Sequence, residues 1–286
     1  MYRDLLIVVE ARNLNESLLR LAPRNAANYE AELTVVVVDI VAPEVVPLVG
    51  FGGGGGAMLP PVNTETDRAE ASQLLSEAKN KILGMLGDQN PLNDINVMSD
   101  TWINIADKIA TLARAVDLFV CFNPLAGDAD AFDRRVFEHV LHHGTCGILV
   151  FPHNAKTVSH PQTVVVAWNQ SVEASRAVKH ALPMLMKARE VTVLLVDPDL
   201  RQAGDEARPG DEIVLHLRRH DVNAKLARVA SSNMSVAAAI EAELDSREGR
   251  MVVMGGYGKN AFTDWLMGSV AREFLEKAEI PILMAV

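Results

Sequence analysis

Short apolar runs alternate with amphipathic stretches along the whole chain. The apolar runs lack a helical period and are rich in β-branched residues, which is typical of buried strands. They occupy residues 5–9, 33–38, 95–98, 118–122, 147–151, 163–168, 191–196, 224–229, 251–254 and 281–286. Helical spacing between them predicts helices over 15–29, 64–86, 103–116, 132–143, 172–187, 211–220, 235–246 and from 269 onward. Such alternation predicts a mostly parallel sheet that helices cover on both faces.

The order of elements starts again after a polar segment with a proline at each end, Pro152 to Pro161. We interpret this segment as a linker between two copies of the same arrangement. The expected fold is therefore α/β, with two tandem doubly wound domains over residues 1–152 and 162–286. Each domain is expected to hold a five-stranded, mostly parallel sheet. A length of 286 residues agrees with two domains of ordinary size.

Composition and charge exclude several classes of protein. The formal net charge of −10 disfavours nucleic-acid binding, which needs a basic surface. The apolar runs end well short of a membrane span, and the first residues lack the layout of a signal peptide. Cys121 and Cys146 are too few for a disulfide framework and are expected to be reduced, buried thiols. We therefore expect a cytoplasmic protein with no nucleic-acid or membrane partner.

The predicted strand at residues 251–254 leads into a glycine-rich segment. Gly255 and Gly258 enclose two residues, and nine more precede Gly268-Ser269. Glycines let a ligand approach the backbone N–H groups, and a helix N-terminus adds unpaired donors and a partial positive charge. We expect Ser269 to be the N-cap of the helix that follows. The segment predicts a phosphate cradle, with an ordinary strand–turn–helix as the alternative.

The spacing Gly-x2-Gly-x9-Gly-Ser, with its flanking strands and helix, resembles the nucleotide-binding signature of the universal stress protein family. The resemblance extends over both halves in element order, but its motif lies in the C-terminal half. It implies a regulatory stress-response protein that binds ATP or another adenine nucleotide, with or without Mg²⁺, at the carboxyl ends of the strands. A weak nucleotide-hydrolysing enzyme and an interaction scaffold that binds no nucleotide are the alternatives.

The same resemblance assigns the ligand-binding positions. Asn169 stands where the family's first strand usually ends in an aspartate that faces the adenosine; the amide keeps an acceptor but loses the charge. Lys259 lies inside the loop and is a candidate partner for a phosphate. The predicted set is Ala167, Asn169, Val196, Met254, Gly255, Gly258, Lys259, Gly268, Ser269 and Val270. No catalytic residue and no metal ligand is predicted.

The N-terminal half departs from the signature. No glycine pair follows its fourth strand, and Pro124 removes a backbone donor there. Nearby carboxylates would repel a phosphate. They are Glu10, at the first-strand acidic position, and Asp128, Asp130 and Asp133. We expect this half to be a degenerate copy that does not bind nucleotide in the family's manner.

Two other patterns are given no ligand. Residues 50–55 formally contain GxGxxG, but Pro60-Pro61 follow instead of a helix, so a loop of open function is expected. His139, His142 and His143 are spaced along one helix without an HExxH order. We expect a polar helix face whose partly protonated imidazoles suit the C-terminal end of the helix dipole.

The last strand of each half, residues 146–151 and 280–286, is almost wholly apolar. A strand at a sheet edge exposes unpaired N–H and C=O groups. Universal stress proteins commonly pair such edges between subunits, and the resemblance implies the same pairing within this chain. We therefore expect an internal pseudo-dimer joined through these strands; a further homodimer remains open.

Overall fold

The computed structural model describes residues 1–41, 65–86, 92–127, 129–155, 161–198, 209–247, 250–256 and 268–286. In the first half these form β1 (Asp4–Glu10), α1 (Glu16–Tyr29), β2 (Glu32–Ile40), α2 (Glu65–Leu86), β3 (Leu92–Asp100), α3 (Trp102–Ala113), β4 (Leu118–Phe122), α4 (Ala131–His143) and β5 (Gly147–Phe151). In the second half they form β6 (Thr163–Ala167), α5 (Val172–Leu185), β7 (Glu190–Val196), α6 (Asp211–Arg219), β8 (Ala224–Val229), α7 (Val236–Ser246), β9 (Met251–Gly255), α8 (Ser269–Lys277) and β10 (Ile282–Ala285).

Within these ranges the strands form one ten-stranded sheet, in the order β3-β2-β1-β4-β5-β10-β9-β6-β7-β8. Each half contributes a parallel set, and the only antiparallel pairing among the described strands joins β5 to β10. The predicted α/β fold with a mostly parallel sheet is confirmed. The first strand of each half, β1 or β6, lies at the centre of that half. The second and third strands of the half lie on one side of it, and the fourth and fifth lie on the other.

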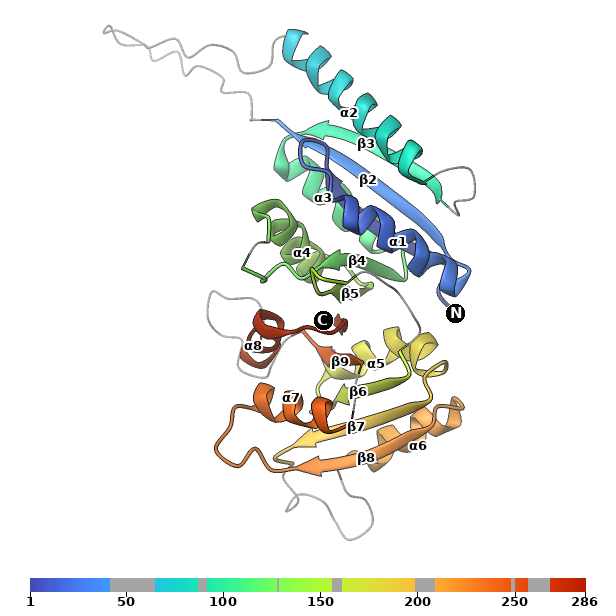
Figure 1. The fold of residues 1–286 in the computed structure, drawn as a ribbon, viewed down its shortest axis with the longest axis vertical. Helices are drawn as coiled ribbons and strands as arrows, with labels where there is room; N and C mark the ends of the chain where they lie inside the picture. Colours follow the sequence, from blue (N-terminus) through green and yellow to red (C-terminus); the bar gives the residue numbers. More distant parts are fainter. Residues whose placement is uncertain are drawn as a thin grey trace, which may run out of the picture.

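Helices cover both faces of the sheet (Figure 1). Buried side chains of α1, α2, α5 and α6 pack on one face, and those of α3, α4, α7 and α8 pack on the other. Alternate residues of each strand point to opposite faces. In β1, for example, Leu5 and Ile7 join the first core and Leu6 joins the second. This two-sided burial explains why the strands read as continuous apolar runs.

The two halves meet along the pairing of β5 with β10. Leu283 lies opposite Leu149 in the antiparallel register, and both side chains are fully buried. The predicted pairing of the last strands is therefore confirmed. Gly147 is required at this seam because a Cβ there would lie 2.9 Å from the Cβ of His180 on α5.

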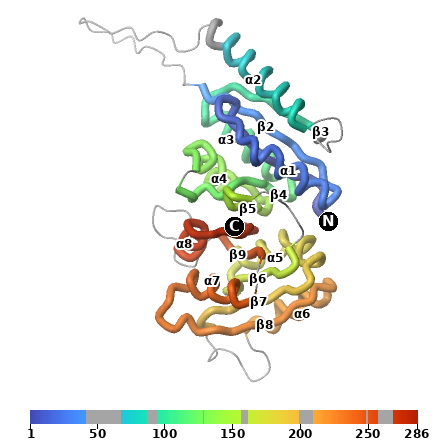
Figure 2. The backbone as a smooth tube through the Cα atoms, in the orientation of Figure 1, coloured from blue at the N-terminus to red at the C-terminus, as the bar shows by residue number. Residues whose placement is uncertain are grey.

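Side chains also connect the halves away from the seam. The N-terminus lies beside α5 (Figure 2), where Tyr2 donates a hydrogen bond to the His180 carbonyl oxygen. The buried Asn123, directly after β4, donates from Nδ2 to the Leu275 carbonyl oxygen of α8 at 2.6 Å. The N-terminal half thus supports a helix that borders the site described below.

The helix predicted over residues 15–29 is confirmed as α1, which runs from Glu16 to Tyr29 through Pro23 with Asn15 as its N-cap. One local expectation was wrong. Ser269 is not the N-cap of α8 but its first helical residue, and the N-cap is Gly268. The backbone explains the shift, because the N–H of Gly268 donates to the Gly256 carbonyl oxygen at 3.1 Å and holds Gly268 in extended conformation.

The remaining sequence expectations concern the cysteines and the histidines. Cys121 and Cys146 are both free and buried, as expected. The pKa of His139 is lowered, first by burial and then by the neighbouring His143, so a protonated face is not favoured there.

Among the described residues no helix is long and apolar enough to cross a membrane, and no group of three or more His, Cys, Asp and Glu side chains is placed to hold a metal ion. The glycine-rich loop at residues 50–55 lies outside the described residues.

Candidate functional site

A pocket opens at the carboxyl ends of β6, β7 and β9, beside the first turns of α7 and α8. It has a volume of about 130 Å³, far more than the roughly 10–15 Å³ that one water needs. Its lining is Ala167, Trp168, Asn169, Leu194, Val196, Val236, Ile240, Met254, Gly255, Gly268, Ser269, Val270 and Ala271. β7 lies on one side of β6 and β9 on the other. The pocket is therefore at the topological switch point of the sheet, where ligands bind to open α/β sheets.

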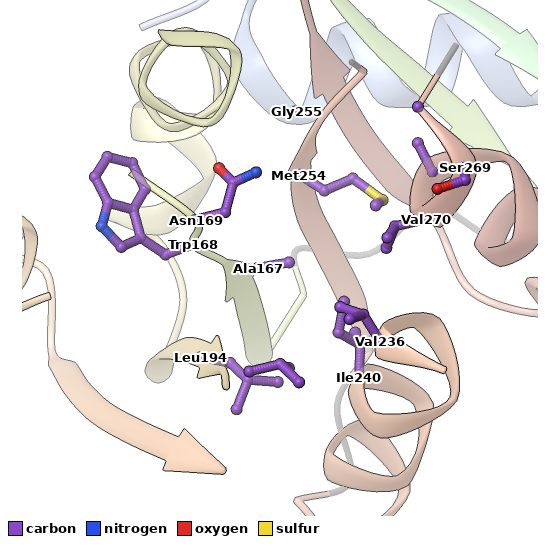
Figure 3. A pocket seen from close by; sticks show the side chains of 13 residues that line it. Ala167, Trp168, Asn169, Leu194, Val236, Ile240, Met254, Gly255, Ser269 and Val270 are labelled. Atoms are coloured by element: carbon purple, nitrogen blue, oxygen red, sulfur yellow. The ribbon is translucent and has the colours of Figure 1, made fainter. Parts of the chain in front are cut away.

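The walls of the pocket are mostly apolar. Leu194 comes from β7, and Val236 and Ile240 lie one helical turn apart on α7 (Figure 3). Met254 and Val270 approach from β9 and α8. No aspartate, glutamate, lysine, arginine or histidine is present among the described lining residues. The pocket therefore suits an apolar ring, with polar contacts restricted to its rim.

The first turn of α8 supplies hydrogen-bond donors to the rim. The first bond within the helix runs from Arg272 N–H to the Gly268 carbonyl oxygen, at 2.9 Å. The N–H groups of the three residues between them therefore have no partner within the helix. Gly268 has no side chain to cap them, and Ser269 is exposed. These donors and the positive end of the helix dipole favour an anion at this position.

The structured glycines next to the pocket are needed for packing. A Cβ on Gly255 would lie 2.8 Å from the backbone nitrogen of Ala174 and 2.9 Å from the Cβ of Glu173. This close approach brings the start of α5 against the end of β9. The N–H of Gly256 donates to the Ala285 carbonyl oxygen at 2.8 Å, so it is not available to a ligand. In this part of the loop, the backbone donors for a ligand are therefore those of the first turn of α8 and not those of the glycines.

Eight of the ten predicted site residues lie together in the pocket lining. They are Ala167, Asn169, Val196, Met254, Gly255, Gly268, Ser269 and Val270. Gly258 and Lys259 lie outside the described residues. The sequence reasoning missed Leu194, Val236, Ile240, Trp168 and Ala271. Leu194 could have been found by strand period, because it lies two residues before Val196, and Val236 directly follows the N-cap Ser235.

Residues 161–285 match the family model described as the universal stress protein family. Residues 161–285 therefore form a domain of the universal stress protein family. No curated protein is significantly similar to the chain. The pocket and every predicted ligand position lie inside the matched residues.

Solved structures with a similar fold, including one of a universal stress protein, match almost the whole chain. A universal stress protein from Archaeoglobus fulgidus DSM 4304 is 15% identical with a TM-score of 0.66, covering 98% of this chain and 95% of its own. Two Pseudomonas aeruginosa proteins, one functionally unknown (strain PAO1) and one putative universal stress protein (strain UCBPP-PA14), are each 14% identical. Each covers 99% of this chain and 92% of its own, with TM-scores of 0.52 and 0.51. At these identities the likeness concerns the fold alone.

The strand registers make the two halves of the chain directly comparable. Leu5 pairs with Leu118, and Val164 pairs with Met251, at the start of the corresponding strands. Counting along these strands, Glu10 corresponds to Asn169 and Asn123 to Gly256. In the N-terminal half the helix after the fourth strand is capped by Asp130, whose side chain accepts from the Phe132 N–H at 3.0 Å. A carboxylate thus already occupies the helix end that remains open in α8.

The carboxylates of the N-terminal half lie close enough to perturb one another. Burial, followed by the neighbouring Asp130, raises the pKa of Asp133 to about 6. Burial and Asp130 also raise the pKa of Glu10. A further anion would meet this accumulated negative charge, which is unfavourable.

Replacing Asp133 with asparagine should stabilise the protein at pH 7.5 but not at pH 4. The folded-state pKa of about 6 lies above the ordinary 3.8, so the protonated carboxyl is favoured by folding. That contribution is complete below about pH 3.8 and is lost as pH rises through about 6. Asparagine stays neutral, and the expected gain at pH 7.5 is on the order of 2 kcal/mol. Urea unfolding at both pH values measures it.

The same exchange at Asp107, an exposed residue of α3, controls for the loss of one negative charge. A gain from Asp133→Asn that is equal at the two pH values, or is reproduced by Asp107→Asn, would contradict the prediction.

Proposed function

We propose that the C-terminal half of this universal stress protein binds ATP or a related adenine nucleotide, and that the chain acts as a regulatory nucleotide-binding protein. One observation carries the proposal. The apolar pocket at the switch point of the sheet continues into the open first turn of α8, inside the residues that match the family. An apolar slot beside a cluster of free N–H donors suits a molecule with a flat ring at one end and phosphates at the other.

The two ends of the pocket would divide the ligand between them. The adenine ring would pack among Leu194, Val236 and Ile240, where no described charged side chain competes. The phosphates would lie against the N-terminus of α8, where Ser269 adds a hydroxyl. The ribose would lie between, beside Asn169 and Met254, which face one another across the pocket in Figure 3. Any Mg²⁺ would be held through the phosphates, since the described lining offers no carboxylate.

The comparison of the halves supports a single site per chain. Where the C-terminal half has an uncapped helix end and Asn169, the N-terminal half has Asp130 and Glu10. The region is negative and its helix donors are partly used, so a phosphate would be repelled. Binding is favoured over hydrolysis because the described lining offers no side chain that would serve as a general base. ATP turnover above the level of a pocket variant would instead favour the hydrolase alternative.

The proposal is tested by identifying what the purified protein carries. Denatured protein should release an adenine nucleotide, identified by its mass. A preparation that carries none should still show a thermal shift when ATP is added, because ligand binding stabilises the folded state. A chain that carries no nucleotide and shows no shift with ATP, ADP or AMP would act as a scaffold, and the proposal would be wrong.

A further inference from the structure

Asn169 is exposed, and one hydrogen bond sets the orientation of its side chain. Its Oδ1 accepts a hydrogen bond from the Ser171 N–H at 3.1 Å, just before α5 begins. A backbone N–H only donates, so the atom that meets it must be the amide oxygen. The Nδ2 group therefore points the other way, and Figure 3 shows it on the side that faces Met254 and the pocket. No described residue accepts a hydrogen bond from it.

Asn169 thus presents a hydrogen-bond donor to the pocket. A carboxylate at this position would use one oxygen for the Ser171 N–H and present the other to the ligand as a charged acceptor. Such an acceptor favours free ribose hydroxyl groups, which can donate, and repels any phosphate on the sugar. The amide donates and carries no charge, so it can bind a hydroxyl oxygen or a phosphate oxygen and repels neither.

The surroundings do not restore the missing negative charge. The described residues that line the pocket include no aspartate or glutamate. The nearest residue along the chain, Gln170, is exposed and neutral. In the N-terminal half the corresponding position is Glu10, where Asp130 lies close enough to raise its pKa. A second phosphate on the sugar would therefore meet no carboxylate among the described residues that line the pocket.

We infer that Asn169 lets the pocket accept adenine nucleotides whose ribose carries a phosphate ester at the sugar hydroxyls, in addition to the 5′-phosphate. The ester oxygens can only accept, which matches the amide donor. This inference rests on the proposed function, because the sugar reaches Asn169 only if the ring and the 5′-phosphate take the two ends of the pocket. It goes further by naming the chemical class of the ligand and the residue that distinguishes it.

The test compares two ligands that differ only by one phosphate, adenosine 5′-monophosphate and adenosine 3′,5′-bisphosphate. Calorimetry gives the Kd of each for the intact wild-type chain and for Asn169→Asp. The wild type should bind the bisphosphate at least as tightly as the monophosphate. The variant should bind the monophosphate more tightly and the bisphosphate more weakly, so the ratio of the two Kd values should change by roughly tenfold or more. Asp keeps the acceptor for the Ser171 N–H, so the variant should fold.

Gln170→Asp is the matched control, because it adds the same charge one residue away and outside the pocket lining. Its Kd ratio should stay within about twofold of the wild type, since its carboxylate would not line the pocket and solvent would screen it from the sugar phosphate. If the wild type binds both ligands but Asn169→Asp leaves the ratio unchanged, or Gln170→Asp changes it equally, the inference is wrong and the proposed function stands. A wild type that prefers the monophosphate by tenfold also overturns the inference alone. A wild type that binds neither ligand nor ATP overturns both.

Discussion

Ser269→Asp is expected to weaken nucleotide binding strongly while leaving the fold at least as stable. Ser269 is the exposed first residue of α8 and lines the pocket. An aspartate in the first turn interacts favourably with the helix dipole, by roughly 0.3–1 kcal/mol. The same carboxylate would occupy the place proposed for the phosphates and repel them. We expect ATP affinity to fall by roughly 100-fold, which is about 2.7 kcal/mol. Calorimetry measures the affinity and thermal unfolding measures the stability.

Ser269→Asn separates charge from shape. Asparagine has nearly the size of aspartate but is neutral, so ATP affinity should stay within about fivefold of the wild type. If both variants lose affinity equally, the effect is steric and the phosphates do not lie where we propose. If neither loses affinity, the first turn of α8 does not contact the ligand.

Leu283→Lys is expected to have the largest effect on stability. Leu283 lies in β10, is fully buried, and is opposite Leu149 across the seam between the halves. An ammonium group at this position would be buried without a partner, which costs several kcal/mol. We expect a loss of at least about 4 kcal/mol in the free energy of unfolding. We also expect faster proteolysis between residues 152 and 161, where the halves are connected.

Leu215→Lys makes the same exchange at a leucine of α6 whose side chain is about half exposed. Its effect should stay within about 0.5 kcal/mol, as is usual for surface substitutions. Urea unfolding followed by circular dichroism measures both variants. A Leu283→Lys protein as stable as Leu215→Lys would mean that the two halves do not share a buried seam.

The fold could be predicted from the sequence because its strands are buried on both faces. Such strands are continuous apolar runs, and runs such as residues 118–122 and 147–151 agree with the structure at both ends. The pairing of β5 with β10 could be expected for a similar reason, since both are apolar edge strands. The N-cap of α8 was misjudged by one residue because its position depends on a tertiary contact. The bond from Gly268 to Gly256, for example, fixes where α8 begins.

The candidate site was predictable only where a sequence motif pointed to it. The glycines and the serine near residues 255–269 indicated the right end of the sheet. The opposite wall was missed because Val236 and Ile240 come from a helix with no such motif, and apolar side chains at a pocket look the same in sequence as those in a core. The orientation of Asn169 could not be read from composition, because it is set by one hydrogen bond to Ser171.

The most direct test of the account is a calorimetric titration of the intact chain with ATP, with Ser269→Asp titrated in parallel. The wild type should show about one binding site per chain, because in the part of the chain that the structure describes the pocket of the C-terminal half adjoins an uncapped helix end, whereas the corresponding helix of the N-terminal half is capped by Asp130. Ser269→Asp should show no measurable binding at the same concentrations. Two sites per chain, no binding to the wild type, or equal binding to both proteins would contradict the account.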